Sequence, residues 1–208
     1  MSGYFITFEG SEGCGKTTQI NALAKRLREK GKIVQITREP GGTLIGEKIR
    51  NLLQDPTHED KISALTELLL FSASRSQLIT NVIKPALSRG EIVISDRFID
   101  STLVYQGLGR NIGLKIVQEI NKIVVDSIEP NLTILLDIDA EIGIKRAKNR
   151  QNGQLDRIEK ESLSFFQLIR DGYLNLAKNS HGRIKVIDGL LTMEQIENRI
   201  WEIIKNQI

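Results

Sequence analysis

The chain of 208 residues is 40% hydrophobic and 26% charged and has 17 Gly but only 4 Pro, which excludes a disordered or fibrous protein and predicts one globular domain over residues 1–208. Its net charge of +3, without a long run of one sign, argues against nucleic-acid binding and suits small anionic substrates. The single cysteine, Cys14, cannot form an internal disulfide, and the sequence has neither a leader pattern nor an apolar stretch of about 20 residues, so we expect a cytoplasmic protein that does not enter a membrane.

Short apolar runs alternate along the chain with segments of helical period. This alternation predicts an α/β fold of three layers, in which a five-stranded parallel sheet carries helices on both faces. In chain order we expect strand Tyr4–Phe8, helix Lys16–Lys30, strand Ile33–Thr37, helices Ile45–Gln54 and Ile62–Leu87, strand Ile92–Ser95, helix Leu114–Ser127, strand Leu132–Asp137, helices Ala140–Arg150 and Glu161–Lys178, strand Ile184–Ile187 and helix Met193–Lys205.

Three local signals support the helix boundaries. Gly31 follows the first apolar helical stripe and is expected to end that helix. Pro85 marks a kink or an end within the long third helix, because it lacks a backbone donor. Thr192 and Gln195 have the spacing of a capping box at the start of the last helix.

The eight residues Gly10-Ser11-Glu12-Gly13-Cys14-Gly15-Lys16-Thr17 match the pattern G-x-x-x-x-G-K-[ST], between a predicted strand and a predicted helix. In such a phosphate-binding loop (P-loop), backbone N–H groups and the helix dipole surround the β-phosphate of a nucleotide. We therefore expect a P-loop NTPase fold that binds ATP through these residues and Thr18, with Lys16 on the β- and γ-phosphates and Thr17 on Mg²⁺. Cys14 is interpreted as a small filler of the loop.

P-loop proteins include switches, motors and kinases, so other residues must decide among them. A GTPase would carry N-K-x-D for guanine, but Asn121-Lys122 is followed by Ile123-Val124. Instead, arginines follow the strand ends, where open α/β sheets bind their ligands. They are Arg38 after the second strand, Arg97 after the third, and Arg146, Arg150 and Arg157 after the fourth. A phosphoryl-transfer enzyme needs such cations because its two substrates repel each other.

Asp96 ends the third strand, directly before Arg97. A carboxylate there can hold Mg²⁺ through water or orient Arg97.

Several motifs in order make the chain similar to the thymidylate kinase family, from about Tyr4 to the last helix. They are Phe8-Glu9-Gly10, Arg38-Glu39-Pro40-Gly41-Gly42, Phe71-Ser72-Ala73-Ser74-Arg75, Asp96-Arg97-Phe98, Ser101-Thr102 with Tyr105-Gln106-Gly107, and Asp156-Arg157-Ile158-Glu159. The resemblance implies transfer of the γ-phosphoryl group of ATP to dTMP in dTTP biosynthesis, with Mg²⁺ as cofactor. It also implies a homodimer, for which the long helix that carries Phe71 is a plausible contact region.

The resemblance also implies roles for the acceptor residues. Phe71 is expected to stack on thymine and Arg75 to hydrogen-bond its carbonyl edge, and their i, i+4 spacing places both on one helix stripe. Thr102 reads the N3 side and Tyr105 packs against the 2′ carbon of the sugar. The full acceptor set is Glu12, Arg38, Phe71, Arg75, Arg97, Ser101, Thr102, Tyr105 and Gln106, in which Arg38 and Arg97 hold the phosphate and Glu12 lies near the 3′-hydroxyl and the Mg²⁺ waters.

Some family members carry a catalytic arginine in the P-loop, and this chain does not. It therefore resembles the bacterial type, in which a lid, here about residues 146–157, supplies that charge. The expected catalytic set is Glu12, Lys16, Arg38, Arg97, Arg146, Arg150 and Arg157.

Three alternatives stay open at this point. One is a kinase for another nucleoside monophosphate or a deoxynucleoside. The second is a non-catalytic nucleotide switch, and the third is a nucleic-acid-binding ATPase, whose affinity for DNA would fall steeply with salt. His58 and His181 lack partners at ligand spacing and are given no role.

Overall fold

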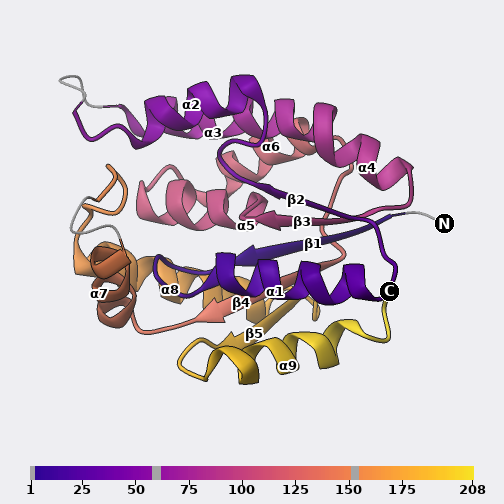
Figure 1. Cartoon of the computed structure of the whole chain (residues 1–208). Coiled ribbons are helices and arrows are strands. Elements are labelled where there is room, and N and C mark those ends of the chain that lie inside the picture. The colour runs from indigo at the N-terminus through magenta and orange to yellow at the C-terminus, as the bar shows by residue number, and fades with distance from the viewer. Residues whose placement is uncertain (1–2, 58–61, 151–154) are drawn as a thin grey trace.

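The computed structural model describes residues 3–57, 62–150 and 155–208. Within these residues the strands are β1 (Tyr4–Glu9), β2 (Val34–Arg38), β3 (Ile92–Asp96), β4 (Leu132–Asp137) and β5 (Ile184–Asp188). They form one parallel sheet of five strands in the order β2-β3-β1-β4-β5 (Figure 1). The parallel sheet predicted from the alternating pattern is confirmed.

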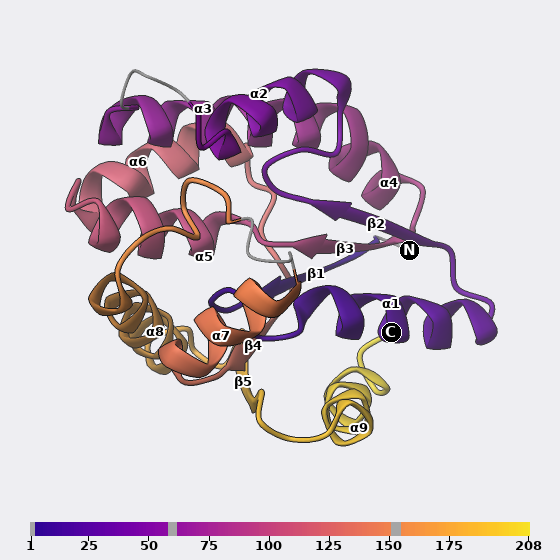
Figure 2. The ribbon, with the colours of Figure 1, turned by 60° about the vertical axis from the view of Figure 1, so that its left-hand side comes forward.

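Helices cover both faces of this sheet, because alternate strand residues point to opposite sides. On one face α1 (Lys16–Glu29) and α9 (Met193–Ile204) pack on Ile6, Ile94 and Ile134. On the other face, Phe5 and Val93 pack under α3 (Ala64–Leu78) and the helices that follow it. Figure 2 shows these layers from a second side.

The remaining described helices connect the strands. α2 packs against α3, and α7 leads into the residues 151–154, which lie outside the description. The bounds of these helices are α2 (Leu44–Gln54), η1 (Ile79–Ile83), α4 (Lys84–Ser88), α5 (Ile99–Thr102), η2 (Leu103–Gly109), α6 (Leu114–Val125), α7 (Ala140–Arg150) and α8 (Leu163–Lys178).

The predicted helix Ile62–Leu87 starts two residues later than expected and is interrupted before Pro85. It begins at Ala64, because Ser63 accepts a hydrogen bond from Thr66 N–H and caps it. The break is the π-helical turn η1, where Lys84 N–H bonds Ile79 C=O five residues back. Pro85 then falls in the first turn of α4, where no donor is needed.

The short helices α5 and η2 were not predicted from the sequence. They follow β3 directly, and η2 buries Leu103, Val104 and Tyr105. A segment this short carries no full period of apolar residues, so its helical form depends on the packing of η2 against α8 and α6. These two helices bring Ser101, Thr102, Tyr105 and Gln106 to the sheet edge.

The other helix boundaries differ from the predicted ones by no more than two residues. The capping box of α9 is confirmed, since Thr192 Oγ1 accepts from Gln195 N–H at 3.2 Å and Gln195 Oε1 accepts from Thr192 N–H at 3.0 Å. No helix in the described part of the chain combines the length and the apolar character that a membrane span requires.

Candidate active site

The P-loop joins β1 to α1 at the carboxyl edge of the sheet. Gly13 has a φ of 71°, and a Cβ there would lie 2.2 Å from the carbonyl oxygen of Gly143 in α7. Only glycine fits this approach, which seats the helix α7 directly on the loop. Lys16 Nζ donates to the carbonyl oxygens of Gly10 and Ser11, each at 3.1 Å, so its ammonium lies inside the loop.

Thr17 and Asp96 meet beside the P-loop, where the ends of β1 and β3 are paired neighbours. The Thr17 hydroxyl donates to Asp96 Oδ2 at 3.2 Å. A hydroxyl and a carboxylate are the hard oxygen ligands that Mg²⁺ prefers, and Mg²⁺ usually needs only one or two protein carboxylates beside substrate phosphates and water. The residues therefore fit the predicted metal. The other reading of Asp96 lacks support, because its described hydrogen bond goes to Thr17 and not to Arg97.

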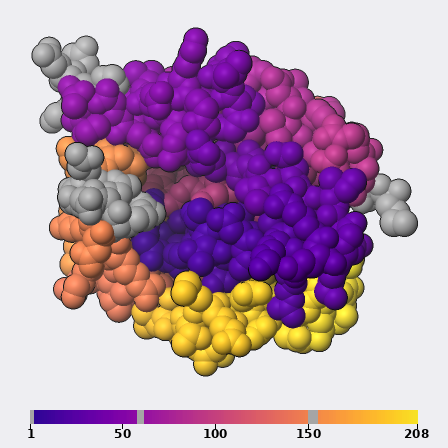
Figure 3. Space-filling view, viewed as in Figure 1, coloured from indigo at the N-terminus to yellow at the C-terminus, as the bar shows by residue number. Residues whose placement is uncertain are grey.

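A cleft of about 820 Å³ opens at this edge, visible in Figure 3 as a hollow between the indigo N-terminal segment and the purple segment of α2. Most of the predicted site residues line it. They are Glu12, Gly13, Gly15, Lys16, Thr17, Thr18, Arg38, Phe71, Arg75, Asp96, Arg97, Ser101, Thr102, Tyr105, Gln106 and Arg146. The donor loop and the predicted acceptor residues therefore share one cavity.

Arg97 is the most heavily bonded cation of the cleft. Its backbone is left-handed, with a φ of 74°, and its guanidinium donates to Glu12 Oε1, to Gly10 C=O and to the hydroxyls of Ser101 and Tyr173. Burial alone would lower the pKa of Arg97, but the surrounding acidic and phenolic groups, Glu12 first among them, hold it well above its ordinary value. Arg97 is a fixed positive charge facing the P-loop.

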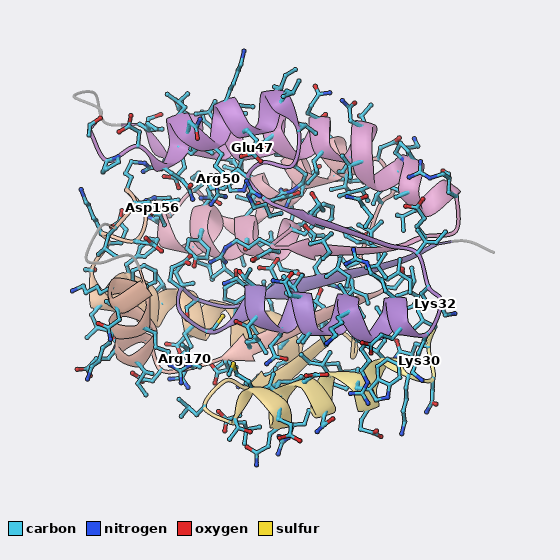
Figure 4. All side chains as sticks on the ribbon, viewed as in Figure 1. Lys30, Lys32, Glu47, Arg50, Asp156 and Arg170 are labelled. Carbon is cyan, nitrogen blue, oxygen red and sulfur yellow. The ribbon has the colours of Figure 1, made fainter. Side chains whose placement is uncertain are left out.

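Arg38 and Arg50 add positive charge on the opposite wall. Arg38 Nη2 pairs with both oxygens of Glu47 at 2.9 Å, and Arg50 Nη1 donates to Pro40 C=O at 3.0 Å. Burial, and after it the charge of Arg38, lowers the pKa of Arg50. Figure 4 shows Arg50 and Asp156 facing each other from α2 and from the segment after α7.

Arg50 was missed from the sequence because it lies within a helix and not after a strand. The sequence around Arg50 carries no motif that marks it as a cleft residue, and only the packing of α2 places it there. Sequence reasoning also gave no site role to the other unpredicted lining residues, which are Glu39, Pro40, Gln54, Asp156, Ile158 and Glu159.

Arg75 lines the cleft, yet only 1% of it is exposed. Nε donates to Glu39 Oε2 at 2.8 Å, Nη1 to Asn121 Oδ1 at 2.8 Å and Nη2 to Thr102 Oγ1 at 2.5 Å. Phe71, one turn earlier on α3, also lines the cleft. The predicted stripe of ring and guanidinium exists, but the guanidinium is largely engaged by the protein.

The expected lid arginines differ in whether they line the cleft. Arg146 lines the cleft and donates to Gly189 C=O at 3.2 Å. Arg157 does not line it, because its guanidinium donates to Leu53 C=O at 2.9 Å and to the buried Glu67 at 2.7 Å. Residues 151–154 and the side chain of Arg150 lie outside the described part of the chain, as does His58.

Comparisons with known proteins show the family to which this chain is similar. The family model of thymidylate kinase matches residues 8–200. The thymidylate kinase of Deinococcus radiodurans is 46% identical over 199 residues, 96% of this chain and 95% of that protein. That of Geobacter sulfurreducens is 45% identical over 210 residues, 99% and 98% of the two chains. A crystal structure of thymidylate kinase from Ehrlichia chaffeensis, 34% identical, superposes with a TM-score of 0.77 and covers 98% of this chain and 99% of that chain. The chain belongs to the thymidylate kinase family.

Proposed function

We propose that this protein transfers the γ-phosphoryl group of ATP to the 5′-phosphate of dTMP, which gives ADP and dTDP for dTTP biosynthesis in the cytoplasm. The observation that carries the proposal is that one cleft holds both halves of the site. The P-loop lines one part of it, and several arginines with the aromatic ring of Phe71 line the other. A nucleotide switch needs no second pocket of this kind. The family membership supports the same reaction. We propose one domain over the whole chain, since one sheet carries both halves of the cleft.

The donor half is assigned to the P-loop. Its backbone N–H groups and the positive end of α1 bind the β-phosphate, and Lys16 moves from the loop carbonyls to the β- and γ-phosphate oxygens. Thr17 and Asp96 would hold Mg²⁺, which supplies charge neutralisation on the phosphate oxygens when bound. Arg146, which lines the cleft, would face the transferred group from the α7 side, and the predicted lid role of Arg150 is kept as part of the proposal.

The acceptor half needs charge and alignment but no general base. The second pKa of a phosphate monoester is about 6, so the attacking oxygen is already ionised at neutral pH. Arg97 and Arg38 hold that phosphate against the repulsion of the donor, with Arg50 beside them. Phe71 stacks on the base, Thr102, Gln106 and one N–H group of Arg75 face its edge, and Tyr105 packs on the sugar. Ser101 and Glu12 complete the contacts around Arg97 and the 3′-hydroxyl.

Arg157 is reassigned from catalysis to structure. Its bonds to Glu67 and Leu53 tie the end of the predicted lid to α3 and α2. Moving Arg157 into the cleft would leave Arg110 as the one cation paired with the buried Glu67 among the described residues and would remove the donor to Glu67 Oε2, at a cost in stability. We therefore expect the lid charge to come from Arg146 and Arg150.

The reaction is tested by an ADP-release assay with Mg-ATP and each of dTMP, dUMP, dCMP, dGMP, UMP and AMP. We expect strong preference for dTMP and, in Arg97→Ala, a loss of about 10²-fold in kcat/KM for dTMP, since a preorganised charge on the phosphate is removed. Preference for another monophosphate would support kinase activity but would contradict the proposed recognition of thymine. ADP release that does not depend on any acceptor would contradict the proposal.

We also propose that the protein is a homodimer that pairs through α3 and α6. Exposed apolar side chains lie along these packed helices, namely Leu65 (53% exposed) and Leu69 (51%) on α3 and Ile116 (52%) and Ile123 (81%) on α6. Such a patch is typical of an interface between subunits.

The dimer is tested by light scattering coupled to size exclusion. The wild type is expected at twice the chain mass, and Ile123→Glu is expected to shift toward the monomer. Ile33→Glu changes an equally apolar and 70% exposed residue outside these helices and should leave the mass unchanged. A monomeric wild type at about micromolar concentration would refute the dimer.

A further inference from the structure

Glu9 is a buried carboxyl that the reaction, as described above, does not use. It is the last residue of β1, directly before the P-loop, and it is 0% exposed. Burying a carboxyl group costs free energy of folding unless its oxygens are hydrogen-bonded. The hydrogen bonds of Glu9 therefore indicate its role. Its described hydrogen bonds come from the segment that follows Arg97 and from Tyr173 on α8, which also contacts Arg97.

One oxygen of Glu9 holds the backbone after Arg97. Oε1 accepts from Phe98 N–H at 2.8 Å and from Ser101 N–H at 3.3 Å. These bonds attach the start of α5 to the end of β1. They also determine that Oε1, and not Oε2, faces the backbone N–H groups.

The other oxygen of Glu9 contacts Arg97 through two hydroxyls. Oε2 accepts from Ser101 Oγ at 2.5 Å and from Tyr173 OH at 2.8 Å. The same two hydroxyls each accept from Arg97 Nη1 at 3.2 Å, and they lie 2.8 Å from each other.

The direction of these bonds depends on the charge of Glu9. An ionised carboxylate only accepts and a guanidinium only donates, so each hydroxyl between them must point its proton at Glu9 and its lone pairs at Arg97. A protonated Glu9 would aim a donor at the same hydroxyls and compete with Arg97 for their lone pairs. The carboxylate therefore sets the polarity that holds Nη1 in place.

We propose that Glu9 is a positioning residue which, as a carboxylate, orients Ser101 and Tyr173 so that they fix the guanidinium of Arg97 for the acceptor phosphate. This inference rests on the role of Arg97 in the proposed function. Glu9 itself does not touch the substrate.

The positioning of Arg97 by Glu9 should depend on pH, because the surroundings of Glu9 change its pKa. Burial, and after it the charge of Asp100 on α5, raises the pKa of Glu9 to about 7, although Arg97, Ser101 and Tyr173 oppose the shift. Arg183, paired with Asp100, is the further cation that faces Glu9. Glu9 thus changes charge near neutral pH, and its ionised form is the one that orders Arg97.

The same shift predicts an unusual effect on stability. A carboxyl whose pKa is higher in the folded state than in the unfolded state binds more protons when folded, so unfolding becomes easier as pH rises from about 4.3 to about 7. Ionised Glu9 therefore lowers stability at pH 8. A neutral replacement of equal size should lower activity without lowering stability, which a purely structural residue would not do.

The experiment compares wild type with Glu9→Gln and Tyr173→Phe. The Gln oxygen is expected to keep the two backbone bonds, so its NH₂ group replaces Oε2 and has the polarity of the protonated acid. We expect kcat/KM for dTMP to fall about 10²-fold in Glu9→Gln, as for a misplaced catalytic group, and about tenfold in Tyr173→Phe, which removes one of the two hydroxyls that accept from Arg97 Nη1 and leaves the other. KM for ATP should change less than about twofold, because the P-loop contacts of the nucleotide are untouched. Glu91→Gln, a change of the same kind directly before β3, is the matched control.

Two readouts separate positioning from structure. The ratio of kcat/KM between wild type and Glu9→Gln should rise from about pH 6 to about pH 8, as wild-type Glu9 ionises, while the titration of dTMP cancels in the ratio. The urea midpoint of Glu9→Gln at about pH 8 should equal or exceed that of wild type. A ratio that is flat with pH, or a midpoint that falls together with activity, would overturn the inference. If wild type does not phosphorylate dTMP, the proposed function fails; if it does and Glu9→Gln is equally active at every pH, this inference alone fails.

Discussion

Replacing Lys16 by Met is expected to lower kcat about 10³-fold with little effect on folding. Lys16 is the one P-loop side chain whose ammonium is held inside the loop, 3.1 Å from the carbonyl oxygens of Gly10 and Ser11. Those carbonyls lie where the β-phosphate is expected, so a small movement transfers the donors to phosphate oxygens. Because charge on these oxygens grows during transfer, a cation fixed there stabilises the transition state more than the ground state. Met keeps the aliphatic stem and removes the charge.

The measurement is the ADP-release assay at saturating dTMP. Lys25→Met is the matched control, since Lys25 lies on the same helix with 80% of its side chain exposed and a loose pair to Glu29 at 4.0 Å. It should retain wild-type kcat. If Lys16→Met keeps more than about a tenth of the wild-type kcat, the donor half of the proposal is wrong.

Arg75→Met is expected to destabilise the folded protein by about 3–5 kcal/mol, the usual result of breaking a buried ion pair from one side. The Arg75 and Glu39 side chains are 1% and 3% exposed and lie 2.7 Å apart. Burial raises the pKa of Glu39 even with Arg75 beside it. Without the arginine, Glu39 must either stay charged in a dry site or take up a proton.

This choice gives the variant a pH signature. A carboxyl with a raised folded pKa favours the folded state at low pH and loses that contribution as pH rises through its folded pKa. The deficit of Arg75→Met, measured by urea unfolding, should therefore be smaller at about pH 5 than at about pH 8. Adding Glu39→Gln should recover part of the loss.

The control for Arg75→Met is a substitution in a solvent-exposed ion pair. Lys84 and Asp126 lie 3.2 Å apart with side chains 57% and 77% exposed, so Lys84→Met should cost less than about 1 kcal/mol. Equal effects of Lys84→Met and Arg75→Met would show that the burial of Arg75 does not matter. Loss of dTMP selectivity in Arg75→Met under conditions where it is folded would further support its place at the base.

The features that the sequence predicted well are encoded locally. Gly10–Thr17 form a P-loop because glycines of positive φ and the start of α1 suffice to build it. The capping box at Thr192 and the stop at Gly31 are likewise settled within a few residues. The resemblance to the thymidylate kinase family, confirmed by the comparisons, named most residues that line the cleft.

Contacts between distant segments decided the rest. Arg157 reads as a lid cation until Glu67, ninety positions earlier, is found buried beside it. Arg50 and the helices α5 and η2 carry no local signal, because the packing of α2 and α8 places them. In the sequence Glu9 is only part of the motif before the P-loop, and only the fold brings Ser101 and Tyr173 to its carboxylate. Loop and cap geometry follow from short-range sterics, which sequence determines by itself. The burial of a charge, and hence its partner and its pKa, follows from long-range packing, which only the tertiary structure decides.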